Sequence, residues 1–77
     1  SKSEFDKFVM DILMTLSKRD RFIIEHRFGL NGEEKHNLEE IGTMLGLTRE
    51  RGRQISDKVL ASLKTKMKSK LKHYEYN

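Results

Sequence analysis

The sequence contains no cysteine and no proline, and no apolar run approaches the ~20 residues that a membrane-spanning helix needs. The absence of cysteine excludes disulfides and thiolate metal sites, and the absence of proline leaves helices uninterrupted from within. His26, His36 and His73 lack the spacing of metal ligands, and there is neither a nucleophile–base pair nor a glycine-rich phosphate loop. We therefore expect no enzyme, no metal, no cofactor and no membrane partner.

The net charge of +4 is unevenly distributed along the chain. From Lys58 to His73 there are six lysines and no acidic residue, whereas most acids lie in the first half. Such a basic end suits a polyanion or an acidic protein partner, and it equally suits a solvated helix end. The length predicts one small domain over residues 1–77, and because the first residue is Ser rather than Met we expect a fragment of a longer chain.

The helical spacing of apolar residues predicts a first helix from Glu4 to Leu16. Its apolar stripe is wide and consists of Phe5, Phe8, Val9, Met10, Ile12, Leu13, Met14 and Leu16. A stripe of this width suits a helix that is covered on two sides. Either the core surrounds the helix, or part of the stripe is a docking surface.

Capping patterns predict where two further helices begin. Ser17 and Asp20 resemble a capping box that opens a second helix, and Gly29 is a plausible left-handed cap at its end. Asn37 and Glu40 form another capping box, which opens a short third helix.

Gly46 closes the third helix, and Thr48 is a natural N-cap for a fourth. The apolar residues of the fourth helix recur every four positions, at Ile55, Val59, Leu63, Met67 and Leu71. We expect residues 73–77 to be a frayed tail. The predicted fold is therefore all-α, a compact bundle of about four helices.

Residues 38–63 have the pattern of a helix-turn-helix, with a basic C-terminal extension at 64–77. Gly42 supplies the small residue where the two helices cross, and Gly46 supplies the positive φ of the sharp turn. The apolar positions that face the core are Ile41, Leu45, Leu47 and Ile55. In such a motif the second helix enters the major groove of DNA.

The fourth helix divides into an apolar face and a polar face. The polar face near its N-terminus carries Glu50, Arg53, Gln54 and Asp57, flanked by Arg49 and Lys58. Arginine can pair with guanine, glutamine with adenine, and glutamate can accept from cytosine, so this face suits base reading. Arg51 and Lys58, at its edges, suit phosphates. The alternative is a solvated, salt-bridged helix face.

One run of residues closely resembles a known family. Arg27-Phe28-Gly29-Leu30, then Leu38-Glu39-Glu40-Ile41-Gly42, then Leu47-Thr48-Arg49-Glu50-Arg51 and Arg53-Gln54-Ile55 look like the fourth conserved region of bacterial sigma factors, most of all the housekeeping type. The resemblance covers about residues 16–63. It implies an all-helical domain that recognises the −35 element of promoters within RNA polymerase holoenzyme and docks on the flap of the polymerase β subunit. It also implies a bacterial cytoplasmic, nucleoid-associated location.

Carried over by position, the resemblance assigns roles to individual residues. The base readers would be Arg49, Glu50 and Gln54. The DNA backbone contacts would be Arg19, Arg27, Asn37, Leu38, Arg51, Arg53 and Lys58, and Lys64 would meet DNA or activators. The partner surface would be Phe5, Phe8, Val9, Ile12, Leu13, Leu16, Phe22 and Ile23. The implied partners are double-stranded promoter DNA, the β flap, and transcription activators or an anti-sigma-type regulator.

Gly52 departs from the family pattern, which has Ile or Val at this position. A glycine inside a helix costs ~1 kcal/mol relative to alanine, and a missing buried side chain costs several more unless neighbours fill the gap. We expect Met44, Phe28 or another chain to fill it, and the recognition helix to be less rigid than in relatives. Asp57, which points toward the phosphates, is expected to weaken DNA affinity.

Two other functions remain open at this point. One is a sigma-like interaction module that is bound by a regulatory protein and reads DNA weakly, which Gly52 and Asp57 favour. The other is a free-standing helix-turn-helix regulator, which has no need of the wide stripe on the first helix.

Overall fold

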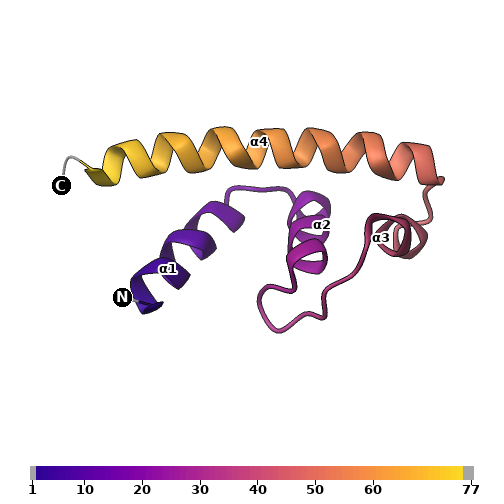
Figure 1. Cartoon of the computed structure of the whole chain (residues 1–77), viewed down its shortest axis with the longest axis horizontal. Helices are drawn as coiled ribbons and strands as arrows, with labels where there is room; N and C mark the ends of the chain where they lie inside the picture. The colour runs from indigo at the N-terminus through magenta and orange to yellow at the C-terminus, as the bar shows by residue number, and fades with distance from the viewer. Residues whose placement is uncertain (1, 76–77) are drawn as a thin grey trace.

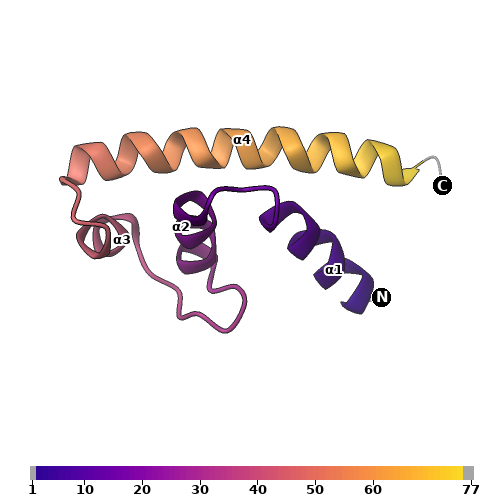
Figure 2. The ribbon, with the colours of Figure 1, turned by 180° about the vertical axis from the view of Figure 1, so that it is seen from behind.

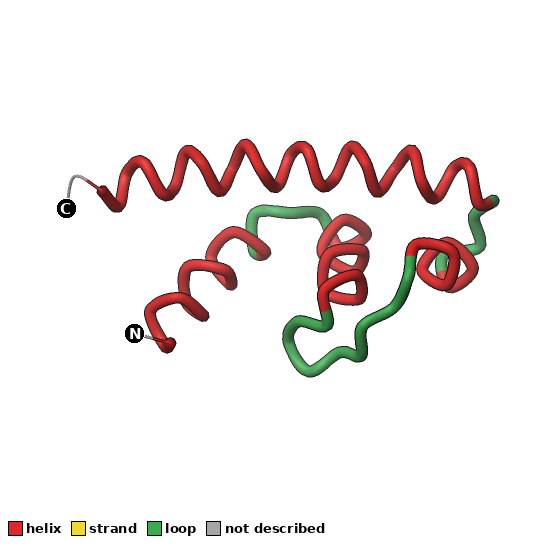
Figure 3. The backbone as a smooth tube through the Cα atoms, in the orientation of Figure 1, coloured by secondary structure: helices red, strands yellow, loops and turns green. Residues whose placement is uncertain are grey.

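The computed structural model describes the backbone of residues 2–75 and the side chains of residues 4–73. Within that range there are four helices and no strand, which confirms the all-α prediction: α1 (Lys2–Leu13), α2 (Lys18–Phe28), α3 (Leu38–Met44) and α4 (Arg49–Glu75). Helix α4 runs along the whole length of the molecule, and the three shorter helices lie in a row against one side of it (Figures 1 and 2). The connections at residues 14–17, 29–37 and 45–48 are loops and turns (Figure 3).

A single hydrophobic core joins the four helices. Its buried members are Leu13, Ile23, Ile24, Ile41, Ile55 and Val59. Because every helix contributes at least one of these side chains, none of the shorter helices can bury its apolar face without α4. Each such side chain stabilises the fold by ~1.5–3 kcal/mol relative to an exposed position.

The predicted caps of α2 and α3 are present. The Ser17 hydroxyl accepts a hydrogen bond from the Asp20 amide at 3.2 Å, but the Asp20 carboxylate pairs with Arg19 instead of returning to Ser17. In α3 the box is complete: Asn37 Oδ1 accepts from the Glu40 amide at 2.8 Å, and Glu40 Oε1 accepts from the Asn37 amide at 2.9 Å. These bonds satisfy amides that the first turn of a helix leaves unpaired.

The turn between α3 and α4 has the geometry of a helix-turn-helix. Gly46 takes a φ of 70°, and the Leu47 amide donates to the Gly42 carbonyl at 2.8 Å. Thr48 caps α4, because its hydroxyl accepts from the Arg51 amide at 3.2 Å. The motif predicted over residues 38–63 is therefore formed, although α4 continues well beyond it.

Two predicted helix ends were wrong. The first helix ends at Leu13 rather than Leu16, because Thr15 turns its hydroxyl back to the Ile12 carbonyl at 2.6 Å and the last turn tightens before Ser17. Helix α4 reaches Glu75, so residues 73–75 are helical and not a frayed tail, while residues 76–77 lie outside the described part. The lysine-rich segment has good helix propensity, and Lys66 and Lys70 tie it to Thr15 and Asp11.

Gly52 leaves no gap of the kind that the sequence suggested. It is buried, and a Cβ atom at this position would lie 3.4 Å from the Cα atom of Gly42. The two helices cross so closely at these glycines that a single Cβ atom would just make contact, which leaves no space for a branched side chain. Met44 and Phe28, which we expected to fill it, are each 47% exposed. That expectation was wrong because it assumed that α3 and α4 lie as far apart as two helices with a branched apolar side chain between them.

Candidate functional site

A hollow lies between the N-terminal ends of α3 and α4. Its volume is about 470 Å³, and it is lined by Asn37, Leu38, Glu39, Arg49, Glu50 and Arg53. Five of these six residues were predicted from the sequence to contact DNA, and the fold brings them to one place from two helices. The capping box fixes the start of α3, and the turn at Gly46 fixes the start of α4 relative to it.

Arg49 stands at the edge of this hollow with most of its side chain in solvent. Its guanidinium approaches the Glu39 carboxylate at 4.0 Å, and the two side chains are 86% and 69% exposed. An ion pair this long and this exposed contributes little to stability. Arg49 is therefore able to turn toward a ligand at low cost.

Arg53 lies between two carboxylates on the exposed face of α4. Its guanidinium contacts Glu50 Oε1 at 2.5 Å and Asp57 Oδ2 at 2.9 Å, and the Gln54 amide reaches the same Glu50 oxygen at 3.5 Å. The hydrogen bond and the charge of Arg53 lower the pKa of Glu50 below its ordinary value of 4.5. The hydrogen bond and charge of Glu50, followed by the charge of Asp57, raise the pKa of Arg53.

This network sets the charge of the candidate site. Glu50, Arg53 and Asp57 together carry one net negative charge, so the arginine presents little free positive charge to an anion. Glu50 and Asp57 accept three of the five N–H groups of Arg53, so a phosphate would compete with these carboxylates for the guanidinium. A base that donates a hydrogen bond to Glu50, such as cytosine, would free Arg53 from that carboxylate.

The remaining predicted DNA residues surround the hollow at a distance or lie on another helix. Arg51 and Lys58 are exposed on α4. Arg19 and Arg27 lie on α2 and do not line the hollow; Arg19 pairs with Asp20 at 3.1 Å, and the Arg27 guanidinium is 5.7 Å from the centroid of the Phe28 ring.

The predicted partner surface is only partly exposed. Ile12, Leu13 and Ile23 are at most 3% exposed and belong to the core. Val9, Leu16 and Phe22 are partly buried and pack against that core. Phe5 and Phe8 line a groove of about 670 Å³ between α1 and the C-terminal half of α4.

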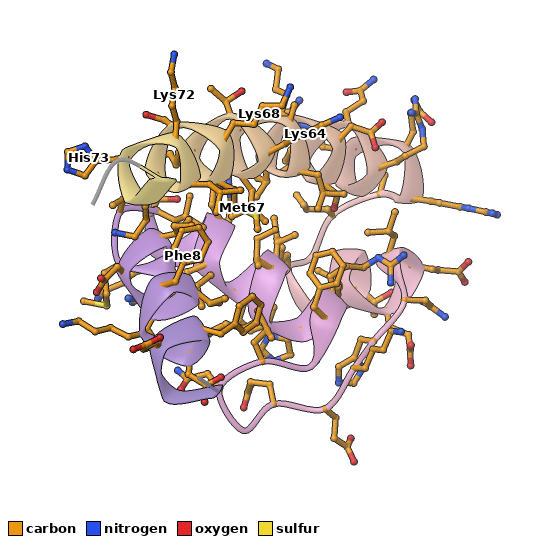
Figure 4. All side chains as sticks on the ribbon, turned by 60° about the vertical axis from the view of Figure 1, so that its left-hand side comes forward. Phe8, Lys64, Met67, Lys68, Lys72 and His73 are labelled. Atoms are coloured by element: carbon orange, nitrogen blue, oxygen red, sulfur yellow. The ribbon has the colours of Figure 1, made fainter. Side chains whose placement is uncertain are left out.

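The other wall of this groove was not among the predicted site residues. It consists of Leu60, Leu63, Lys64, Met67, Lys68 and Leu71, all from α4. Figure 4 shows Phe8 and Met67 on the sides of α1 and α4 that face each other. A signal was present in the sequence, because the apolar line of α4 continues past the length that a recognition helix needs. We refer to this feature as the α1–α4 groove.

Sequence reasoning also missed the contact that holds the loop before α3. His26 is 7% exposed, its Nε2 lies 2.7 Å from Glu33 Oε2, and its Nδ1 lies 2.8 Å from the Phe22 carbonyl. The His36 amide donates to the His26 carbonyl at 2.7 Å. These bonds tie the 29–37 loop to α2 and so position Asn37 at the hollow.

Other kinds of site find no support in the described residues. No group of three or more His, Asp or Glu side chains in residues 4–73 could hold a metal ion. Among the described helices, none is long and apolar enough to cross a membrane.

Comparison with known proteins agrees with the geometry. The family model described as Sigma-70, region 4 matches residues 12–65. The chain is 43% identical over 61 residues to the protein named RNA polymerase sigma factor sigF, chloroplastic, of Arabidopsis thaliana, which covers 79% of this chain and 11% of that protein. It is 43% identical over 60 residues to RNA polymerase sigma factor SigA of Bacillus sp, covering 78% of this chain and 16% of that protein. The chain thus spans only a small part of each relative, and it belongs to the Sigma-70, region 4 family.

Proposed function

We propose that this domain recognises the −35 element of promoters as part of an RNA polymerase sigma factor. The observation that carries the proposal is the exposed N-terminal end of α4, the second helix of the helix-turn-helix, where Arg49, Glu50 and Gln54 stand together. Side chains at this end of a recognition helix are the ones that reach base edges. Asn37, Leu38 and Arg51 flank them and are suited to fix the register through phosphates.

The test compares binding of a −35 duplex and a scrambled duplex across a series of salt concentrations. We expect the −35 duplex to bind more tightly at every salt concentration, with parallel salt slopes for the two duplexes, because phosphate contacts are common to both. Equal affinity for the two duplexes would mean that phosphates alone carry the binding and would contradict the proposal.

We further propose that the domain docks on the flap of the polymerase β subunit through the α1–α4 groove. Phe5 and Leu71 line this groove and are 62% and 54% exposed, so neither side chain is used to fill the core of the domain itself. Apolar surface of this kind, bordered by charged side chains, is typical of protein interaction sites. A pull-down with the isolated β flap tests this second proposal. We expect the flap to retain the domain, whereas a free-standing regulator would not be retained.

A second candidate function is an interaction module with weakened DNA reading, which activators or an anti-sigma-type regulator would bind. The observation in its favour is that Arg53 is held by Glu50 and Asp57. If this restraint limits DNA affinity, Asp57→Asn should strengthen binding to both duplexes. If Asp57→Asn leaves both affinities unchanged, the restraint does not weaken DNA reading.

A further inference from the structure

The alternating lysines near the C-terminus lie in two rows on opposite faces of α4. Lys66 and Lys70 face α1 and are partly buried. Lys66 Nζ donates to Thr15 Oγ1 at 3.2 Å, and Lys70 Nζ lies 3.6 Å from Asp11 Oδ2. This inner pair ties the C-terminal half of α4 to α1 and to the turn that follows it, and has a structural role.

Lys64, Lys68 and Lys72 form the other row and are exposed. Figure 4 shows Lys72 projecting from the side of α4 that is turned away from α1. Among the residues whose side chains the structure describes, none of these three lysines forms an ion pair with a carboxylate. We call them the outer lysine row.

The outer lysine row lies on the same side of α4 as the candidate base readers. Lys72 follows Gln54 by about 18 residues, or about five turns at 3.6 residues per turn, so the two side chains leave the helix in the same direction. At 1.5 Å per residue, Lys72 is about 27 Å along the axis from Gln54. That distance is shorter than one turn of DNA, which is about 34 Å.

The composition of this face favours phosphates over a protein partner. The residues that share this side of α4 with the lysines are small, namely Ala61, Ser62, Thr65 and Ser69. Lysine is depleted at protein–protein interfaces, whose centres are rich in aromatic and apolar side chains. Phosphate contacts, in contrast, come from lysine and from hydroxyl side chains. The apolar side chains of the same segment line the α1–α4 groove, and of the outer lysine row Lys64 and Lys68 stand at its border, whereas Lys72 does not line it.

We propose that the outer lysine row binds phosphates of duplex DNA within one helical turn of the bases that the N-terminal end of α4 reads. The proposal rests on the function proposed above, and it goes beyond it because Lys68 and Lys72 lie outside the family match of residues 12–65. In this chain, α4 would therefore carry both a base-reading end and a phosphate-binding end. The second end would strengthen binding to any sequence next to the −35 element.

The test compares two double variants of the chain that have the same charge change. Lys68→Gln/Lys72→Gln alters the outer lysine row, and Lys66→Gln/Lys70→Gln alters the inner pair. Binding is measured on a −35 duplex with long flanks and on one trimmed to the element, each across a salt series. On the long duplex the outer variant should lower the slope of log K against log salt by up to about 1.8, because each phosphate contact contributes about 0.9. The inner variant should leave that slope unchanged, and neither variant should change the slope on the trimmed duplex.

Three results would overturn the proposal. The first is an unchanged slope for the outer variant on the long duplex. The second is an equal loss for the outer and inner variants, since this would indicate net charge rather than a located contact. The third is an unchanged DNA slope together with weaker binding to the β flap, which would assign the row to a protein site. A failure of the −35 function shows separately, as equal wild-type affinity for the −35 and scrambled duplexes.

Discussion

The Cα atom of Gly42 lies 3.4 Å from the point where a Cβ atom on Gly52 would stand. The two glycines thus allow a close crossing of α3 and α4, with no space between them for a branched side chain. A glycine that looked like a defect in the sequence is one half of a tight helix crossing. Its cost in helix propensity is offset by the close packing that it permits.

Replacements at Gly52 should separate helix propensity from packing. Gly52→Ala should stabilise the domain by at most ~1 kcal/mol, because the added Cβ fits at the limit of contact. Gly52→Ile should destabilise it by ~1–3 kcal/mol, because the branched atoms must push α3 away. Urea unfolding measures both effects.

Gly42→Ala provides the matched control for these replacements. A Cβ at this position meets only the carbonyl oxygens of Leu47 and Thr48, at 3.9 Å, so it should gain helix propensity without strain. If Gly52→Ile proves more stable than Gly52→Ala, the gap that the sequence suggested exists and the close crossing is wrong.

The Glu50–Arg53 contact predicts a pH dependence with a definite sign. Because the pKa of Glu50 is lowered in the folded state, its contribution to stability is present above the ordinary value of 4.5 and is lost as the pH falls through the lowered value. An NMR titration of the Glu50 carboxyl should therefore have its midpoint below 4.5. Arg53→Gln should return the midpoint toward that ordinary value. A midpoint that does not respond to Arg53→Gln would show that the ion pair does not form in solution.

The tie between His26 and Glu33 should order the loop before α3. Removing it by Glu33→Ala should speed amide exchange over residues 30–37, because the His26 ring loses its 2.7 Å partner. His26→Ala, which also removes stacking on Phe22, should cost ~1–3 kcal/mol of stability. Glu34→Ala is matched in charge and is an exposed neighbour in the same loop. Equal exchange rates in Glu33→Ala and Glu34→Ala would contradict the assigned role.

Phe5 offers a clean test of docking in the α1–α4 groove. Because it is 62% exposed, Phe5→Ser should leave the unfolding free energy nearly unchanged. It should nevertheless weaken binding to the isolated β flap by about tenfold or more, as the loss of a central aromatic contact does. Phe28→Ser, at a 47% exposed position outside the groove, is the control. Equal flap binding by both variants would place the docking surface elsewhere.

The sequence predicted the local features of this fold well. The Asn37–Glu40 capping box, the turn at Gly46 and the Thr48 cap depend on residues within a few positions of one another, and all are present. Features that depend on distant elements were missed. The stripe of the first helix could not reveal which side chains α4 covers, so Ile12 and Leu13 looked as available as Phe5.

The candidate site divides in the same way. The helical period alone predicted a polar face with Glu50, Arg53, Gln54 and Asp57, whereas the choice of Arg49, Glu50 and Gln54 as base readers came from the family resemblance. The distance between α3 and α4 at Gly52 could not be derived, because it depends on a second glycine on the partner helix. The helical period places alternate lysines on opposite faces of α4, but only the packed position of α1 shows which row is covered.

The most direct measurement of the central claim is the ratio of affinities for the −35 and scrambled duplexes in single variants of α4. Arg49→Ala should reduce the difference in binding free energy between the two duplexes by ~1–3 kcal/mol, because a base contact is lost. Arg51→Ala should leave the ratio unchanged and lower the salt slope by about 1, because a phosphate contact is lost. If Arg49→Ala instead weakens both duplexes equally, the N-terminal end of α4 does not read bases and the account is contradicted.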